Sequence, residues 1–291
     1  MASSDNPNSG NPALVITEEE FQRFCDFFYR RTGMIFGSGK RYYVDRRLLA
    51  RIQATGSTDF QDYFIWLQSD RAEQEALINA FTINETYFYR EEHQFKCLTA
   101  SLLPEIVARK PRGQPIRIWS VPCSTGEEPY SLAIWLLENW AAVDDWNVEI
   151  LAADIDTGVL QAAERAVYGE RALMRLPRAL VTRYFEMVGE REWRLSADIR
   201  GSVTYSRVNV VEAGEMARYR NMDVVFCRNM LIYFDDVSRR EAAENFYDCL
   251  APGGFICLGH TESMSRISPL FRVRRFADAI VYQKPVEVLR A

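Results

Sequence analysis

The feature that most limits the possible folds of this chain is a change in its apolar pattern near residue 115. Before that point, apolar residues recur at helical spacing, as in Phe21, Phe24, Cys25 and Phe28. After it, short apolar runs alternate with helical segments, which is typical of a doubly wound α/β sheet that is parallel in its main part. We therefore expect an N-terminal all-helical domain followed by a sheet domain.

Composition and helix breakers divide the 291 residues into four segments. Residues 1–14 are rich in Ser, Asn, Pro and Gly, which predicts a disordered leader. We expect residues 15–82 to form the helical domain and residues 83–114 to form a linker with a connecting helix. Residues 115–287 are then the sheet domain.

The strand candidates of the sheet domain are short apolar runs bounded by turn residues. They are Ile116–Val121, Val148–Ala153, Val203–Val208, Val224–Cys227, Phe255–Leu258, Phe271–Arg274 and Ala279–Gln283. Helical segments at Pro129–Trp140 and Thr157–Val167 separate the first of them. We interpret Trp193–Leu195 and Val203–Tyr205 as a hairpin around Gly201, which predicts a small inserted β-subdomain at about residues 190–207.

Charge and composition exclude several classes of protein. The formal net charge of −5 and the pI near 5.4 argue against a general nucleic-acid binder. The longest uncharged run, Cys249–Thr261, has 13 residues, whereas a membrane span needs roughly 18 or more. The N-terminus lacks a secretory pattern.

The chain has six cysteines without a C-x-x-C pair and only two histidines. This composition predicts free thiols in a reducing cytoplasm and no metal site.

The loop after the first strand is the first candidate ligand site. It reads Pro122-Cys123-Ser124-Thr125-Gly126-Glu127-Glu128-Pro129, and ligands of open α/β sheets bind at such strand ends. Gly126 would let a ligand approach the backbone. The dinucleotide fingerprint G-x-G-x-x-G is absent, and the two glutamates oppose a pyrophosphate, which favours a cationic or uncharged ligand. A simple capped helix start is the alternative interpretation.

Two acids follow the second strand. An acid at this position commonly binds ribose hydroxyls, and Asp154 is the better ligand candidate. Asp156 precedes Thr157 and is the better candidate for a helix N-cap. Further along, a helix, an L-x-P-G-G turn at 250–254, a strand and a short terminal hairpin resemble a class I S-adenosylmethionine-dependent methyltransferase, whose sheet ends in an antiparallel strand.

Five motifs occur in order along residues 15–285. They are NETYFYR (84–90), CSTGEEPYS (123–131), the acids Asp154 and Asp156, FCRNMLIYF (226–234) and GHTES (259–263). Together they strongly resemble the CheR family of chemotaxis receptor methyltransferases. Two positions depart from the family pattern: Tyr89 stands where Phe is usual, and Pro122 stands where a small residue is common.

The resemblance implies a Rossmann-like class I methyltransferase that moves a methyl group from S-adenosylmethionine to glutamates of chemoreceptor cytoplasmic helices, leaving S-adenosylhomocysteine. In some members the β-subdomain binds a receptor C-terminal tail peptide. By motif match, the cofactor-binding residues are Asn84, Thr86, Arg90, Glu127, Asp154 (ribose), Asn209, Val210 (adenine), Arg228 and Asn229. Of these, Arg90, Arg228 and Asn229 have positioning roles.

The chemistry agrees with this interpretation. A glutamate side chain has a pKa of about 4.3 and is already ionised at pH 7, so attack on a sulfonium methyl group needs no general base. We therefore expect no essential catalytic base, only in-line positioning.

The N-terminal helices carry an excess of positive charge. Residues 21–52 contain eight basic and two acidic residues. A basic helix with Arg46, Arg47 and Arg51 suits a receptor helix rich in glutamate. A solvated helix face is the alternative interpretation.

Other functions remain to be separated by experiment. A class I methyltransferase could act on another acceptor, and a protein could bind the cofactor without turnover. A dehydrogenase is disfavoured because the glycine fingerprint is missing.

Overall fold

The computed structural model describes residues 15–286. The predicted disordered leader lies outside these residues, and so does residue 287 at the end of the predicted sheet domain. Contacts within the chain group into two units. One unit comprises the described chain up to Arg31 together with Phe36–Phe81, and the other comprises Thr32–Ile35 and the described chain from Thr82 onward.

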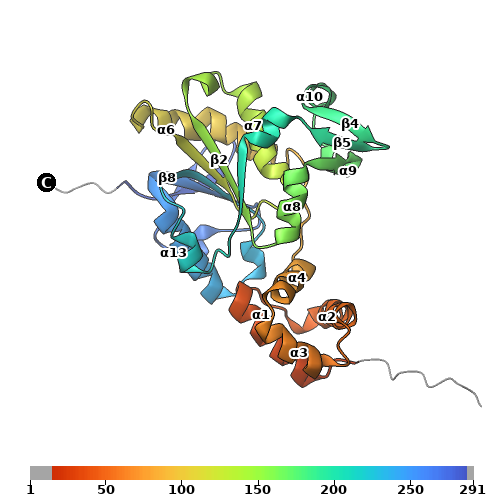
Figure 1. Ribbon diagram of the computed structural model, residues 1–291. Coiled ribbons are helices and arrows are strands. Elements are labelled where there is room, and N and C mark those ends of the chain that lie inside the picture. Colours follow the sequence, from red (N-terminus) through yellow and green to blue (C-terminus); the bar gives the residue numbers. More distant parts are fainter. Residues whose placement is uncertain (1–14, 287–291) are drawn as a thin grey trace, which may run out of the picture. The chain divides into compact units, whose positions relative to one another are not determined.

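The first unit is built from four helices, drawn in red and orange in Figure 1: α1 (Glu18–Thr32), α2 (Arg41–Thr55), α3 (Phe60–Ser69) and α4 (Arg71–Phe81). Helix α1 begins with a capping box, because the Glu20 N–H donates to Thr17 Oγ1 (3.2 Å) and the Thr17 N–H donates to the Glu20 carboxylate (2.9 Å).

The aromatic residues of α1 form the core of this unit. Phe21, Phe24 and Phe28 are buried, and the rings of Phe24 and Phe81 lie 4.9 Å apart. The predicted helical spacing of the apolar residues is therefore confirmed, although Cys25 is only half-buried.

The second unit contains a seven-stranded sheet with the order β6-β2-β1-β7-β8-β10-β9. The strands are β1 (Ile116–Ser120), β2 (Val148–Asp154), β6 (Val203–Arg207), β7 (Met222–Cys227), β8 (Leu250–Leu258), β9 (Arg272–Arg275) and β10 (Ile280–Gln283). The first five strands in this order pair in parallel, whereas β10 is antiparallel to both β8 and β9. The predicted class I methyltransferase sheet, with its antiparallel terminal strand, is confirmed.

Helices cover both faces of this sheet (Figure 1). The longer ones are α6 (Leu103–Arg109), α7 (Glu127–Asn139), α8 (Thr157–Arg165) and α13 (Asp236–Cys249). Alternate strand residues enter two separate cores: Val224 and Phe226 pack with the α6–α7 side, while Val225 and Cys227 pack with the α13 side. Burial on both faces explains the almost continuous apolar runs of these strands.

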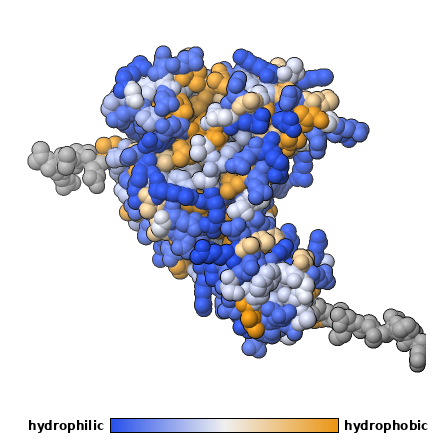
Figure 2. Space-filling model, in the orientation of Figure 1, coloured by the Kyte–Doolittle hydropathy of each residue, from blue (hydrophilic) through white to orange (hydrophobic). Residues whose placement is uncertain are grey.

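The β-subdomain is a three-stranded sheet with the order β3-β5-β4. It comprises β3 (Val167–Gly169), β4 (Phe185–Gly189) and β5 (Glu192–Leu195). Figure 2 shows hydrophobic surface in the region of β4, and there Met187 and Val188 are exposed.

The predicted hairpin of Trp193–Leu195 with Val203–Tyr205 is wrong. Trp193–Leu195 pairs with β4, whereas Val203–Tyr205 belongs to β6 and pairs in parallel with β2 of the large sheet. The turn lies at 190–191, where Arg191 has a φ of 61°, and Gly201 instead ends the short helix α11 (Ala197–Gly201). The β-subdomain therefore extends back to Val167, because its outer strands precede the segment that the apolar pattern had singled out.

Candidate functional site

One pocket of the second unit lies at the carboxyl ends of β1, β2 and β7, the position expected for a ligand in an open α/β sheet. Its lining comes from the 83–90 segment before helix α5 (Glu92–Cys97), from the loop after β1, from Asp154 at the end of β2, and from residues 228–233 after β7. The sequence motifs that are far apart along the chain thus meet in one place.

The loop after β1 leads into α7 through Gly126, which has a φ of 94°. A Cβ atom at this position would lie 2.7 Å from the Tyr205 hydroxyl and 2.9 Å from the Ala163 Cβ. The space beside Gly126 is therefore filled by side chains of β6 and α8 and not by a ligand. The packing of these two elements against the loop requires a glycine here, whereas the sequence suggests room for a ligand.

The two glutamates after Gly126 have different environments. Glu127 is buried and accepts a hydrogen bond from Thr125 Oγ1 (2.6 Å), outside the pocket lining. Glu128 lines the pocket and accepts hydrogen bonds from Ser120 Oγ (2.7 Å) and Arg228 Nη1 (2.9 Å). Desolvation by burial raises the pKa of both carboxyl groups.

Asp154 ends β2 with its carboxylate in the pocket lining. Its two oxygens accept the backbone N–H groups of Ser124 (2.9 Å) and Asp156 (3.0 Å). Burial raises the pKa of Asp154 to about 6, although backbone hydrogen bonds from Asp156, Ser124 and Ile155 oppose the shift. A carboxylate can accept about four hydrogen bonds, so capacity for a further donor remains.

Asp156 is the N-cap of α8, as predicted, because it accepts the N–H groups of Gly158 (2.8 Å) and Val159 (3.1 Å). Its other oxygen accepts hydrogen bonds from Thr82 Oγ1 (2.5 Å) and Asn84 Nδ2 (2.9 Å). The cap therefore also fixes the start of the 83–90 segment.

That segment supplies Asn84, Thr86 and Arg90 to the pocket, as the motif match had suggested. The Arg90 guanidinium donates to the Glu85 carbonyl oxygen (2.6 Å) and lies 5.9 Å from the centre of the Tyr87 ring. Its neighbour Tyr89 is buried against Trp135.

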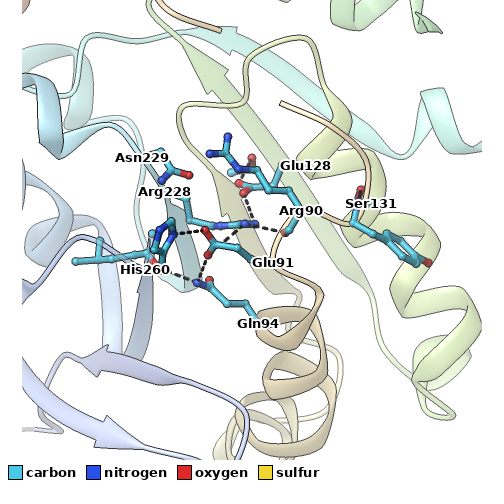
Figure 3. Close-up of polar contacts among 12 residues, drawn as sticks. Arg90, Glu91, Gln94, Glu128, Ser131, Arg228, Asn229 and His260 are labelled. Atoms are coloured by element: carbon cyan, nitrogen blue, oxygen red, sulfur yellow. Dashed lines mark hydrogen bonds and ion pairs between the residues drawn. The ribbon is translucent and has the colours of Figure 1, made fainter. Parts of the chain in front are cut away.

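Arg228 and Asn229 follow β7 and line the same pocket (Figure 3). The Arg228 side chain is only 3% exposed. Its guanidinium donates to Glu128 and to the Arg90 carbonyl oxygen (2.7 Å), and it forms an ion pair with Glu91 (3.4 Å). Asn229 has a φ of 58° and donates its backbone N–H to the Glu262 carboxylate (2.8 Å).

Asn209 and Val210 are buried after β6 and are not in the pocket lining. The Asn209 N–H donates to Glu215, and the Val210 carbonyl oxygen accepts from Asn245. Their proposed place beside an adenine ring stays a prediction.

The pocket lining also contains residues that the sequence analysis did not assign to the cofactor, among them Ser124, Glu128 and Tyr233. Tyr233 belongs to the motif FCRNMLIYF (226–234) and lies two residues after the buried Leu231. Its membership of this motif could have identified it as a pocket residue. Its carbonyl oxygen accepts the N–H of Ile35 (3.0 Å), which attaches the 32–35 segment to the wall of the pocket.

The predicted receptor-binding arginines all lie on α2 of the first unit, but their side chains differ. Arg51 makes hydrogen bonds of 3.0 and 2.5 Å to the buried carboxylate of Glu73, and Arg47 donates to the Ala80 carbonyl oxygen (2.7 Å). Arg46 is exposed and has no hydrogen-bond or ion-pair partner within residues 15–286. Only Arg46 thus has a guanidinium that is free to meet a partner.

Within the described residues, no group of three or more His, Cys, Asp or Glu side chains could hold a metal ion. None of the described helices combines the length and apolar character that a membrane crossing requires.

Comparison with known proteins covers both units. Residues 19–82 match the family described as CheR methyltransferase, all-alpha domain, and residues 84–280 match CheR methyltransferase, SAM binding domain. The chain is 48% identical to chemotaxis protein methyltransferase 2 of Vibrio cholerae, over 94% of this chain and 95% of that protein. It is 36% identical to the Salmonella typhimurium chemotaxis protein methyltransferase (90% and 89% covered) and 34% identical to that of Escherichia coli (90% of each).

We predict that Gly126→Ala lowers the free energy of unfolding by about 1–3 kcal/mol, because the added Cβ meets Tyr205 and Ala163 and the backbone has a positive φ. Urea unfolding measures this loss. Gly201→Ala is the matched control, since a Cβ there meets nothing within 4 Å. Equal stability of the two variants would show that the loop adjusts without cost.

Proposed function

This chain belongs to the CheR methyltransferase family, and on that premise we propose that glutamate side chains of chemoreceptors accept the methyl group in its pocket. The protein is an S-adenosylmethionine-dependent methyltransferase that acts on chemoreceptors in chemotaxis. When bound, S-adenosylmethionine supplies a methyl group on a positively charged sulfur, which an anion can displace.

The pocket residues fit this cofactor. The lining combines buried carboxylates, which suit a cationic ligand, with the Nε atom of Arg228, which is buried without a hydrogen-bond partner among the described residues. The Asp154 carboxylate has capacity for a further hydrogen bond beyond those from the backbone, and it could accept a ribose hydroxyl. The cofactor-binding residues that we propose are those that line the pocket: Asn84, Thr86, Arg90, Asp154, Arg228 and Asn229.

The observation that carries the choice of acceptor is the guanidinium of Arg90 in the pocket lining, because a positive group there suits an anionic acceptor. An amine or amide acceptor would have to lose a proton. A glutamate carboxylate does not, and Arg90 can attract and orient it.

A product test separates the acceptors. The enzyme is incubated with S-adenosylmethionine labelled in the methyl group and with membranes that carry candidate chemoreceptors. We expect label on the receptor that mild alkali releases as methanol, because methyl esters hydrolyse readily. Label that survives alkali would show amine or amide methylation, and label on another protein would contradict the receptor as the acceptor.

We predict that cofactor affinity falls as the pH is lowered through about 6, because the ionised Asp154 carboxylate is the better acceptor and its pKa is raised to about 6. Asp154→Asn should weaken binding roughly 10- to 100-fold, as expected for a lost hydrogen bond to a charged group. It should also flatten the pH dependence. Titration calorimetry from pH 5 to pH 8 measures both effects. Asp144→Asn, at an exposed position, is the control, and an unchanged pH profile in D154N would contradict the assignment.

We also propose that the receptor approaches the basic face of α2, with Arg46 as the contacting residue. Arg46→Glu should raise the KM for receptor about fivefold, corresponding to roughly 1 kcal/mol, and leave cofactor affinity unchanged. The effect should shrink at high salt. Arg240→Glu makes the same charge change at an exposed site of the second unit and serves as the control. Equal KM values for the two variants would reject this surface.

The β-subdomain is the proposed site for a receptor tail peptide. Strand β4 is at the edge of its sheet and exposes Met187 and Val188, so an extended peptide could pair with its backbone and cover these side chains. The enzyme would then meet both the cytoplasmic helices and the tail of the receptor in the cytoplasm. Membranes that carry receptors with and without their C-terminal tails test this, since equal rates would exclude a role for the tail.

A further inference from the structure

Glu91 lies outside the pocket lining but contacts Arg228, which together with Glu128 forms the charged floor of the pocket (Figure 3). It follows Arg90 directly, has a φ of 56°, and its side chain is 12% exposed. One carboxylate oxygen accepts from Gln94 Nε2 (2.8 Å) and lies 3.4 Å from Arg228 Nη2. The other lies 3.2 Å from His260 Nδ1. The carboxylate is thus held on both sides.

Arg228 is the group that these contacts hold. Its guanidinium lies between two carboxylates, with Nη1 at 2.9 Å from Glu128 and Nη2 at 3.4 Å from Glu91. All three side chains are at most 12% exposed. Gln94 also donates to the Leu258 carbonyl oxygen (2.8 Å), which fixes the amide that orients Glu91.

The cluster of Glu91, Arg228 and Glu128 has one positive group and two carboxyl groups. With both carboxyl groups ionised, it carries a net charge of −1 next to the pocket. Charges inside a protein interact through a lower effective dielectric constant than charges in water, so the cluster acts on a charged ligand in the pocket. A buried cluster is also screened by salt less than a surface pair.

The cofactor and its product differ in charge. S-adenosylmethionine has a positive sulfonium, whereas S-adenosylhomocysteine has a neutral thioether of nearly the same shape. A negative cluster favours the first over the second, and a neutral cluster does not. The charge of the cluster therefore sets how strongly the product competes with the cofactor.

We propose that Glu91 is a positioning residue that orients Arg228 from behind the pocket and gives the cluster the negative charge that favours the cationic cofactor over its neutral product. This inference rests on the proposed function only for the identity of the cofactor and does not depend on which residue accepts the methyl group.

The test is the ratio of two binding constants. Calorimetric titration of the full-length protein with S-adenosylmethionine, S-adenosylhomocysteine and sinefungin, an analogue with a positively charged amine, gives three dissociation constants. Glu91→Gln removes the charge and keeps the shape. We expect the cofactor and sinefungin to lose about three- to tenfold more affinity than S-adenosylhomocysteine.

Two further variants separate charge from structure. Glu92→Gln changes the adjacent residue, which pairs with Lys96 at the surface, and should leave all three constants unchanged. Glu91→Asp keeps the charge and should keep the ratio within about twofold of the original protein. Equal weakening of all three ligands by E91Q, or the same ratio change in E91D as in E91Q, would overturn the proposal.

The measurement also separates this proposal from the proposed function. Failure of the unsubstituted protein to bind S-adenosylmethionine would contradict the cofactor itself. Normal binding with an unchanged ratio in E91Q would contradict only the role of Glu91.

Discussion

The buried guanidinium of Arg228 is the interaction on which the rest of the site depends. A buried charge is costly unless it is paired and hydrogen-bonded. Arg228 meets this requirement with a carboxylate of α7, a carboxylate at the start of α5 and the Arg90 carbonyl oxygen. Two of these partners come from the adjacent residues Arg90 and Glu91, and the third, Glu128, lies more than 35 residues further along the chain. Removing one carboxylate would leave Arg228 with a single ion-pair partner.

We propose that the site works by positioning rather than by proton transfer. Burial raises the pKa of Glu127, Glu128 and Asp154 because it removes water from their charged forms, and the ion pair with Arg228 opposes this shift in Glu128. A cation in the pocket would stabilise the charged forms of Glu128 and Asp154 further. The fixed N–H groups around Asp154 and the backbone contacts of Arg228 hold both side chains in place before any ligand binds. Prearranged charges of this kind lower the reorganisation needed for reaction.

Much of the fold could be predicted because its signals are local. The N-cap at Asp156 and the apolar strands of the large sheet depend on neighbouring residues, and each was found in the structure. The hairpin around Gly201 failed because strand pairing is not local. Val203–Tyr205 has the alternation of a hairpin strand, yet it pairs with β2, about 50 residues earlier in the chain.

The sequence by itself determined the types of element, the family and the residues that gather at the ends of β1, β2 and β7. Only the tertiary structure decided which of them face the pocket. Glu127 and Glu128 are adjacent in the sequence, but successive helix residues point about 100° apart, so only Glu128 reaches Arg228. Gly126 and Arg51 were read as groups open to a ligand or a receptor, yet α8 and Glu73 respectively fill the space around them. The physical reason is the same in each case: a side chain's chemistry is encoded locally, whereas its available space and partners are set by packing between distant segments.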